Sequence, residues 1–414
     1  MEPLTITYDS KNHGECQYSL DELLDRTPLP KELDAFFNVI SYQDLLKTIS
    51  SGRTRAYSTL GRAGYPLEAM LKAYLATYFI RGIGSIADLV ERLQSDFLFA
   101  MSLGFDITKQ IPHRTTFSRF VGKLVKHQKL IDKCLAEITN KLQALLPDFG
   151  KTACVDCTPV PSWSNPSKER ASDPEAGFIF KGVVEGRNKW VFGYRFFVVS
   201  DAVHELPIGI MLTESGNNEK KMLMPLLADV KQRFPWFKPT AICADAGFDK
   251  YEHFEGIVKQ YDAEPIIALS RKVEVSGSPS APQCKAGLPF IFKGWNKDQL
   301  VYWCPEKAKK AKCPLPERCT HSAMVLRPVH DYRKFGYRIQ RKSEEWKELY
   351  DKRSAAERVN SRLEKRRLKS HCFRKRNRIN LHATLSTLAM QAMALSKIQV
   401  GKSAEIRVCG RKIG

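Results

Sequence analysis

The sequence lacks any apolar run long enough to cross a membrane. The longest such stretch, Leu67–Ile80, contains Glu68 and Lys72, whereas a transmembrane helix needs about 20 predominantly apolar residues. The first residues of the chain also lack the positive charge and apolar run of a secretory signal. We therefore expect a cytoplasmic protein whose 11 cysteines are reduced and do not form a disulfide framework.

Acidic residues are fewer than basic residues in this sequence. The 414 residues include 66 Lys and Arg against 45 Asp and Glu, which gives a formal net charge of +21. A hydrophobic content of 43% and an aromatic content of 10% exclude wholesale disorder, and the length suffices for two or three cores. The charge predicts a polyanionic partner, and the lack of a basic amphipathic anchor favours nucleic acid over a membrane surface.

The sequence contains no internal repeat. Its first part is predicted to be helical. Residues 1–54 give only weak signals, but from Leu67 onward apolar residues recur every three or four positions. Ser85 followed by Asp88 is typical of a capping box, and Thr115 or Thr116 is placed to cap a long helix that ends near residue 146. We therefore predict an all-helical domain over residues 55–148, suited to DNA binding and assembly.

The periodicity changes at Lys151. Strands are predicted near residues 153–155, 190–200 and 207–213, then a helix at 218–234, a strand at 240–244, a helix at 250–261 and a strand at 264–270. This order predicts an α/β fold with a mixed sheet flanked by helices. This α/β domain occupies 149–271 and continues in 336–400, which contains one long helix from Glu344 to about Leu368 and an apolar helix at 381–398. Residues 272–335 resemble an inserted subdomain, and 401–414 form a tail.

Two acidic residues each follow a buried strand. Asp156 comes directly after Ala153-Cys154-Val155, and Asp245 comes directly after residues 241–244. A carboxylate at a sheet edge is costly unless it is paired or bound to a cation, and a divalent metal satisfies two that lie close together. A single Asp of this kind more often caps a turn. Two of them in one sheet of a basic protein favour a metal site.

A third candidate acid lies on the predicted late helix. Tyr350, Arg353 and Glu357 are spaced so that they share one helical face. An ordinary solvated face is the simplest interpretation. The functional interpretation is that Glu357 completes a metal site while Tyr350 and Arg353 contact a phosphate.

Other residues compete for these roles. Asp201 follows a strand but falls in a predicted hairpin, and Asp249 is placed to cap the helix at Lys250. Lone histidines are more often structural than ligands. The alternatives that remain open for metal or phosphate contact are Asp201, Asp249, Glu348, Glu364, His113 and His204.

Taken together, Asp156, Asp245 and Tyr350-x2-Arg353-x3-Glu357 resemble the catalytic signature of bacterial insertion-sequence DDE transposases of the tyrosine-arginine-glutamate type. The likeness covers roughly residues 60–395. It also includes the segments 112–117, 193–196 and 244–249. The lysine often found seven residues after the glutamate is Glu364 here, and Lys365 follows it. The resemblance implies a ribonuclease H-like catalytic domain interrupted by a cysteine-bearing insertion.

The resemblance also implies a mechanism. Two Mg²⁺ or Mn²⁺ ions held by Asp156, Asp245 and Glu357 would support in-line attack on a phosphodiester. Water would cut an element end, and the freed 3′-OH would then be joined to target DNA. The implied partner is double-stranded DNA, bound by a homodimer or higher oligomer in the bacterial nucleoid. The alternatives are a metal-dependent nuclease of the same fold without strand transfer, and a non-catalytic DNA-binding protein derived from a transposase.

A basic segment follows the predicted glutamate. Between Ser361 and Arg378 there are nine Lys and Arg and one acid, Glu364. A solvated helix usually mixes charges of both signs, so a segment of one sign predicts contact with DNA phosphates. The predicted DNA-binding residues are Tyr350, Arg353, Arg362, Lys365, Arg366, Arg367, Lys369, Arg374, Lys375, Arg376 and Arg378.

The cysteines allow two interpretations. In the predicted insertion, four thiolates could hold a structural Zn²⁺, with His321 or His330 as substitute ligands, although no pair has the usual short zinc-knuckle spacing. Cys154 and Cys157 resemble a redox or zinc pair, but on a strand they point to opposite faces, so buried cysteine is predicted there. The candidate zinc ligands are Cys284, Cys304, Cys313 and Cys319.

Overall fold

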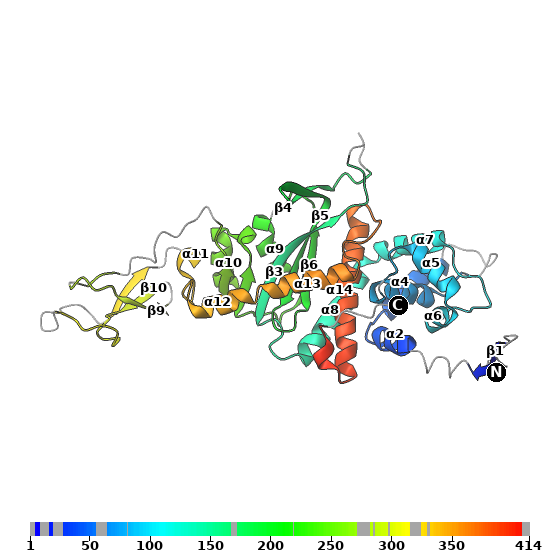
Figure 1. The fold of residues 1–414 in the computed structure, drawn as a ribbon, viewed down its shortest axis with the longest axis horizontal. Helices are drawn as coiled ribbons and strands as arrows, with labels where there is room; N and C mark the ends of the chain where they lie inside the picture. Colours follow the sequence, from blue (N-terminus) through cyan, green and yellow to red (C-terminus); the bar gives the residue numbers. More distant parts are fainter. Residues whose placement is uncertain are drawn as a thin grey trace. The chain divides into compact units, whose positions relative to one another are not determined.

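The computed structural model of the chain comprises two compact units (Figure 1). The first contains Met1–Leu145, Pro159–Tyr194 and Asn360–Gly414, and the second contains Leu146–Thr158 and Arg195–Val359. The structure describes residues 5–8, 16–19, 28–54, 64–80, 82–166, 172–217, 219–270, 282–284, 286–296, 299–314, 324–328 and 332–407. Within these ranges no helix is long and apolar enough to cross a membrane.

The first unit is mainly helical and is organised around its last long helix, α14 (Arg376–Gln399). This helix is buried almost throughout from Leu381 to Ser396, and it packs against α8, α4, α2 and α7. The predicted apolar helix therefore forms, and it packs against the helices of this unit. The other helices are α2 (Pro28–Asn38), α3 (Gln43–Thr54), α4 (Leu67–Phe79), α5 (Ile86–Ser95), α6 (Phe97–Ser102), α7 (Arg114–Lys126) and α8 (Gln128–Leu145), and β1 (Thr5–Tyr8) pairs with β2 (Cys16–Ser19).

Local signals explain where several of these helices begin. The Ser85 hydroxyl accepts the Asp88 N–H and the Asp88 carboxylate accepts the Ser85 N–H, which confirms the capping box of α5. At α7 the prediction was wrong, because His113 is the N-cap and its Nδ1 accepts the Thr115 N–H at 3.4 Å. The predicted long helix is also divided, since the His127 N–H bonds to the Leu124 carbonyl three residues back and α8 begins at the next residue.

Six strands form a mixed sheet. Their order is β4-β5-β3-β7-β8, and β6 pairs with β5. The strands β3, β7 and β8 are parallel, whereas β4 and β6 run antiparallel to β5. The strand β4 was not predicted. The strands are β3 (Thr152–Pro161), β4 (Gly177–Val184), β5 (Arg187–Asp201), β6 (Pro207–Thr213), β7 (Ala241–Ala244) and β8 (Glu264–Ile267), with helices α9 (Glu219–Arg233), η1 (Ala246–Phe248) and α10 (Tyr251–Tyr261) between them.

Residues beyond β8 include a small antiparallel sheet and the helices that follow it. The strands β9 (Ile291–Asn296), β10 (Gln299–Trp303) and β11 (Met324–Pro328) pair in the order β11-β10-β9. A small core of Phe290, Leu300 and Tyr302 stabilises this sheet. The chain continues through α11 (Tyr332–Phe335), α12 (Glu344–Asp351), α13 (Ser354–Lys365), α14 and η3 (Ser403–Glu405).

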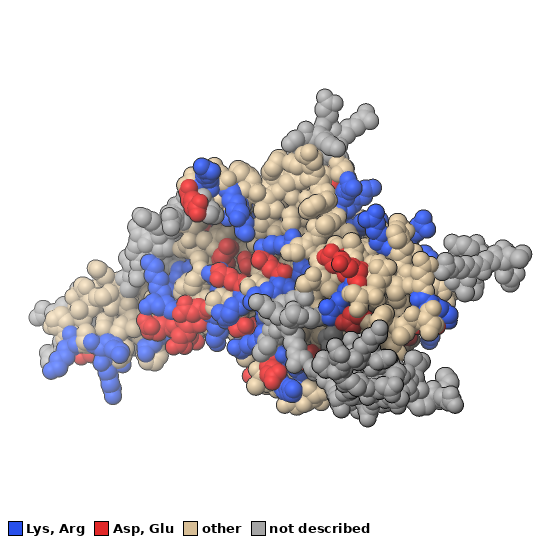
Figure 2. All heavy atoms as spheres, turned by 45° about the vertical axis from the view of Figure 1, so that its right-hand side comes forward, with Lys and Arg blue, Asp and Glu red and all other residues tan. Residues whose placement is uncertain are grey.

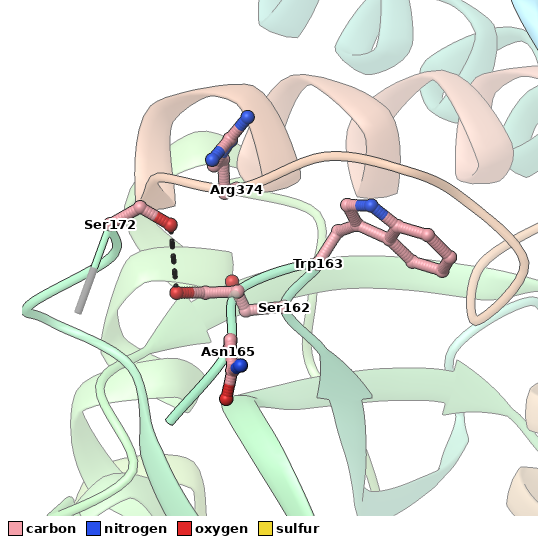
Figure 3. A pocket seen from close by; sticks show the side chains of 6 residues that line it. Ser162, Trp163, Asn165, Ser172 and Arg374 are labelled. Carbon is pink, nitrogen blue, oxygen red and sulfur yellow. Dashed lines mark hydrogen bonds between the residues drawn. The ribbon is translucent and has the colours of Figure 1, made fainter. Parts of the chain in front are cut away.

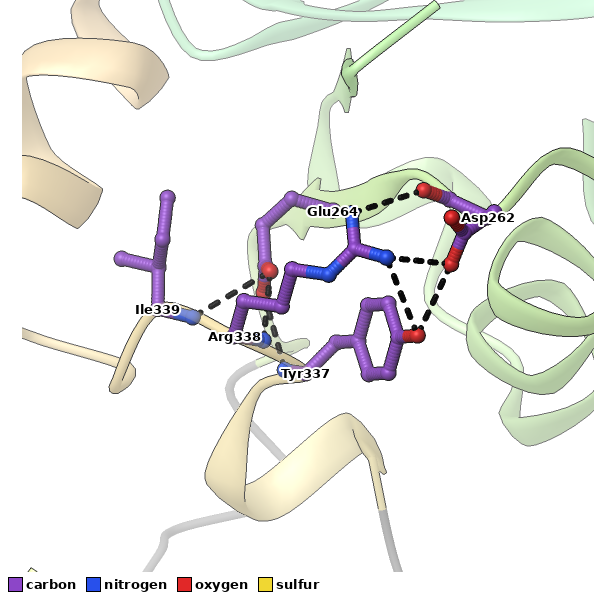
Figure 4. Close-up of polar contacts among 5 residues, drawn as sticks. All are labelled: Asp262, Glu264, Tyr337, Arg338 and Ile339. Atoms are coloured by element: carbon purple, nitrogen blue, oxygen red, sulfur yellow. Dashed lines mark hydrogen bonds and ion pairs between the residues drawn. The ribbon is translucent and has the colours of Figure 1, made fainter. Parts of the chain in front are cut away.

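A buried carboxylate anchors the return of the chain to the large sheet. Glu264 on β8 accepts the backbone N–H groups of Tyr337 at 2.8 Å, Arg338 at 2.7 Å and Ile339 at 3.2 Å (Figure 4). The Arg338 guanidinium also pairs with Asp262 at the end of α10. These contacts fix the segment that leads into α12, and α12 itself packs against β7 and β8.

Candidate active site

The strands β3 and β7 bring the two predicted aspartates together. In the parallel register Cys154 lies opposite Cys243 and Val155 lies opposite Ala244, so Asp156 and Asp245 are the next residue on each strand. The prediction that the first strand ends before Asp156 was wrong, because β7 ends at Ala244 but β3 continues to Pro161. Asp156 therefore lies within β3, at the point where its pairing with β7 ends. The Asp156 Oδ1 atom accepts the Cys157 N–H at 2.8 Å, and the Asp245 Oδ1 atom accepts the Gly247 N–H at 2.9 Å. Both carboxylates are half-buried. Their two carboxylates are thus contributed by neighbouring strands.

The cysteines two residues before these aspartates identify the face on which the site lies. Side chains two positions apart on a strand share a face, so Cys154 lies on the side of Asp156 and Cys243 on the side of Asp245. Both cysteines are fully buried and belong to one apolar cluster with Ala355 and Ala356 of α13. The aspartates therefore lie on the face of the sheet that α13 covers.

The predicted helix through Glu344 and Leu368 is interrupted beside these cysteines. At Lys352 and Arg353 the backbone hydrogen bonds join residues three apart instead of four apart. The Arg353 N–H donates to the Tyr350 carbonyl at 2.9 Å, and the Ala355 N–H donates to the Lys352 carbonyl at 2.9 Å. The Leu349 carbonyl thereby loses the donor that a regular α-helix would supply. We therefore correct the single predicted helix to α12 and α13.

Two buried thiols donate to carbonyls at this interruption. The Cys243 Sγ atom lies 3.3 Å from the Leu349 carbonyl oxygen, and the Cys154 Sγ atom lies 3.2 Å from that of Lys352. The Cys154 side chain, and then burial, raise the pKa of Cys243 well above its usual range, so its thiol stays protonated. Sequence reasoning treated Cys154 only as a buried residue and overlooked Cys243. The signal that could have found the pair is its equal spacing of two residues from each aspartate.

Glu357 follows the buried Ala355 and Ala356 on α13, and 57% of its side chain is exposed. Its Oε1 atom forms an ion pair with the Arg353 Nη1 atom at 2.8 Å. The Arg353 guanidinium lies over the Tyr350 ring at 5.7 Å, and that ring stacks on Trp346 with centroids 5.0 Å apart. Because the helix is interrupted, these side chains form a series of contacts and do not project side by side from one regular helix.

Arg353 is the cation that links the acids in this arrangement. Burial alone lowers the pKa of Arg353, but the hydrogen bond with Glu357 and the charges of Glu357 and Asp245 raise it overall. The positive charge of Arg353 thus offsets both Glu357 and Asp245. The described residues contain no ready-made group of three or more His, Cys, Asp or Glu side chains that could hold a metal ion.

The competing acids have other partners. Asp201 is fully buried and accepts the His204 N–H at 2.5 Å, which is a contact of the turn between β5 and β6. It also accepts the Gly150 N–H at 2.8 Å, from the segment before β3. Asp249 does not cap α10 as predicted. It forms a two-pronged ion pair with Arg333, at 2.6 and 2.7 Å, and accepts the Ser270 N–H.

The predicted histidine candidates have structural contacts. The His204 Nε2 atom lies 2.9 Å from the Pro147 carbonyl oxygen, and His113 caps α7. Among the alternative acids, Glu364 pairs with Lys369. These contacts occupy the polar groups that a metal or phosphate would otherwise use.

The basic segment divides into buried and exposed residues. Arg362, Arg366 and Arg367 are buried, and Arg367 donates to the Thr77 hydroxyl and the Gly84 carbonyl at 2.6 Å each. A buried arginine that bonds within the fold cannot serve as a solvent-facing phosphate contact, so the structure argues against these three as DNA-binding residues. Lys365, Arg374, Lys375 and Arg376 are exposed, and Arg378 and Lys369 are partly exposed. Figure 2 shows one face, on which basic and acidic side chains lie interspersed.

The predicted zinc ligands are only partly described. Cys284 and Cys304 pack against the small core of Phe290, Leu300 and Tyr302, and Cys313 is half-buried. Cys319, together with His321 and His330, lies outside the described residues. The cysteines that are described give no zinc cluster.

Three antiparallel strands, followed by two parallel strands with helices between them, in the order β6-β5-β3-β7-β8, have the arrangement of a ribonuclease H-like fold. With acids at the point where the parallel pairing of β3 and β7 ends, this is the arrangement of a nucleic-acid-processing enzyme of that fold. Residues 150–391, more than half of the chain, match the family model described as the transposase DDE domain, and the chain belongs to this family. Residues 19–123 match a second model, described as a transposase domain (DUF772).

Other comparisons add less. Among solved structures, the piggyBac transposase synaptic complex with hairpin DNA is similar, with 13% sequence identity and a TM-score of 0.44. The match covers 91% of this chain and 78% of that chain. A likeness this distant carries no argument of its own. No curated protein matches the sequence.

Proposed function

We propose that this DDE transposase cleaves the ends of an insertion element and joins the freed 3′-OH to target DNA with Asp156, Asp245 and Glu357. The observation that supports the proposal is the register of β3 and β7, in which the two aspartates follow paired residues of neighbouring strands on the face covered by α13. The tyrosine-arginine-glutamate motif then supplies the third carboxylate from that helix.

The donor set fits divalent metal ions, which enzymes of this family use. Three carboxylates match the oxygen ligands preferred by Mg²⁺ and Mn²⁺, and those of Asp156 and Asp245 each accept a backbone N–H group. The Glu357 side chain is exposed, and its carboxylate would be free to bind a metal once the ion pair with Arg353 is broken. Two such ions supply activation of the attacking oxygen and stabilisation of the leaving oxygen in an in-line displacement.

The chain's own residues have separate roles. Asp156 and Asp245 would hold the metal ions, and their strands fix the positions of both carboxylates. Arg353, released from Glu357, offers a guanidinium to a phosphate oxygen, and the Tyr350 ring holds that guanidinium in place. The exposed basic residues Lys365, Lys375 and Arg376 bind phosphates of the DNA backbone.

Double-stranded DNA is the partner we propose, in the form of element ends and target. Two ends must be handled together for insertion, so we propose a homodimer or higher oligomer on DNA in the bacterial nucleoid. The net charge of +21 supports a polyanionic partner.

A strand-transfer assay separates this proposal from its alternatives. Purified protein is given Mg²⁺, a labelled element end that has already been cut to leave a free 3′-OH, and a supercoiled target plasmid. The transposase proposal predicts a covalently joined product. Cleavage of an uncut end without any joined product would indicate a nuclease, and DNA binding without either product would indicate a non-catalytic derivative.

A further inference from the structure

The first unit contains a pocket of about 420 Å³ that the proposed chemistry does not use (Figure 3). Its volume lies within the roughly 300–1,000 Å³ typical of small-ligand sites. The residues that line it carry hydroxyls, a carboxamide, an indole and a guanidinium, and none is acidic. They are Ser162, Trp163, Ser164, Asn165, Ser172 and Arg374.

A buried carboxylate holds the walls of this pocket in place. Asp173 is fully buried and accepts the Ser162 hydroxyl at 2.5 Å, the Tyr194 hydroxyl at 2.5 Å and the Lys375 N–H at 2.8 Å. Burial, and then the hydrogen bond to Asp173, raise the pKa of Tyr194 above its usual range, so this hydroxyl remains a donor. One carboxylate therefore ties the segment after β3 to the segment before α14.

Backbone contacts reinforce the same wall. The Trp163 N–H donates to the Phe373 carbonyl at 2.8 Å, and the Ser162 N–H donates to the Phe192 carbonyl at 2.9 Å. At Gly193 an added Cβ atom would lie only 2.0 Å from the Val160 carbonyl oxygen, so only glycine permits this close approach of β5 to the end of β3. The backbone that carries Trp163 is thus fixed from two sides.

The side chains on this rigid backbone remain open to solvent. The Trp163 residue is 64% exposed, and Arg374 is exposed as well. They project from two different segments, Trp163 after β3 and Arg374 before α14 (Figure 3). The hydroxyls of Ser164 and Ser172 lie 3.0 Å apart, which adds a polar surface near both.

We propose that this pocket binds one unpaired nucleotide of a DNA strand, with the base against Trp163 and a phosphate on Arg374. The flat face of an indole can stack on any base, and a guanidinium forms bidentate hydrogen bonds with phosphate. The serine hydroxyls and the Asn165 amide can bond the edge of a base. A base within a duplex has both faces covered by its neighbours, so only an unpaired nucleotide can use the indole. This inference rests on the proposed function in so far as DNA is the substrate.

The test measures binding without chemistry. A fluorescent duplex with an unpaired thymidine tail, and the same duplex with a blunt end, are titrated with the full chain in EDTA, and fluorescence anisotropy is followed. The tail is expected to increase affinity. Trp163→Ala should lower affinity for the tailed duplex by about 5- to 100-fold and leave the blunt duplex unaffected, because one stacked base contributes at this level. Trp163→Phe should retain most of the effect.

Matched variants make the result specific. Trp190→Ala removes a tryptophan of the same unit that is 53% exposed on β5, and it should leave tail binding unchanged. Arg374→Ala should weaken tail binding and reduce its salt dependence. Equal binding of the tail by Trp163→Ala and the unmodified chain, or an equal loss in Trp190→Ala, would overturn the proposal. Competition by dTMP at the concentrations at which the tail itself binds would show that a free nucleotide is the ligand and would also overturn it.

The same preparations separate this inference from the proposed function. Asp245→Ala should bind the tail as the unmodified chain does, because Asp245 belongs to the second unit and does not line the pocket. A chain that cleaves and joins DNA but gains nothing from the tail refutes the pocket proposal alone. A chain that binds the tail but neither cleaves nor joins refutes the proposed function alone.

Discussion

Cys154 and Cys243 lie opposite each other on the parallel strands β3 and β7, and each precedes a proposed catalytic aspartate by two residues. Their thiols donate to the carbonyls of Lys352 and Leu349, where α12 gives way to α13. The pair therefore connects the strands that carry the aspartates to the helix that carries Glu357. This connection explains how a residue far along the chain is positioned relative to the sheet.

Replacing Cys243 tests this connection. Cys243→Val removes the donor to the Leu349 carbonyl, and a buried carbonyl without a donor costs about 1–3 kcal/mol. We expect single-turnover cleavage of a labelled element end to slow by about tenfold or more, because small displacements of catalytic groups are costly. Cys243→Ser keeps a donor and should cleave faster than Cys243→Val.

A matched control exists in the first unit. The buried Cys134 thiol donates to the Ser41 carbonyl at 3.0 Å, so Cys134→Val removes the same kind of bond. This variant should lose stability but retain the cleavage rate of its folded fraction. Equal rates for Cys243→Val and Cys134→Val would show that Cys243 has no positioning role.

The ion pair between Arg353 and Glu357 predicts competition between arginine and metal. Arg353→Gln removes the cation 2.8 Å from Glu357 and near Asp245, so Mn²⁺ should bind the DNA-free protein more tightly, by up to about fivefold. Calorimetric titration with Mn²⁺ measures this. The double variant Arg353→Gln with Glu357→Gln should lose the gain, and an unchanged Mn²⁺ affinity in Arg353→Gln would contradict the prediction.

The basic segment predicts different consequences for its buried and exposed arginines. Arg367→Ala removes hydrogen bonds to Thr77 and Gly84, and we expect the free energy of unfolding to fall by about 3 kcal/mol. Arg376→Ala should leave stability nearly unchanged but lower DNA affinity and reduce the salt slope by about one unit. Chemical denaturation and DNA titrations at several salt concentrations measure these effects. A reversed pattern would refute the assignment.

The buried His371 predicts a loss of stability in acid. Burial, and then the positive charge of Arg367, lower the pKa of His371 to about 4, whereas the unfolded chain has a pKa near 6.5. Between these values the unfolded chain binds a proton that the folded chain does not, so unfolding becomes easier as pH falls. The free energy of unfolding should drop by up to about 1.4 kcal/mol per pH unit from this residue.

Urea unfolding between pH 7 and pH 5 checks this prediction. His371→Gln should reduce the slope of stability against pH by up to one proton, while the buried His382, whose pKa is also lowered by burial, continues to contribute. An identical slope in His371→Gln and the unmodified chain would show that His371 does not cause the effect.

The sequence predicted those features that depend on neighbouring residues. The capping box at Ser85 and Asp88 and the strand at residues 207–213 follow from local hydrogen bonding and alternation, and both are present. Strand β4 escaped prediction because it exposes Phe178 and Phe180, whose rings contact Phe192 and Trp190 on β5. Apolar residues on an exposed hairpin do not give the usual alternation of a half-buried strand.

Features that depend on distant residues could not be predicted. The interruption at Lys352 depends on thiols about 100 and 200 positions earlier, and the burial of Arg367 depends on Thr77 and Gly84. A run of basic residues gives no sign of which guanidinium groups the fold encloses. Asp156 and Asp245 were identifiable because each follows a short buried apolar run, but only β7 ends there, and the continuation of β3 to Pro161 was not predicted.

The most direct test of the central claim uses Asp156→Ala, Asp245→Ala and Glu357→Ala, with Glu348→Ala as the control acid on α12. Mg²⁺-dependent cleavage of a labelled element end and DNA binding are measured on the same preparations. The account predicts that the first three variants lose cleavage and keep DNA binding, while Glu348→Ala cleaves normally. Normal cleavage by Asp156→Ala, Asp245→Ala and Glu357→Ala would contradict the assignment of the active site.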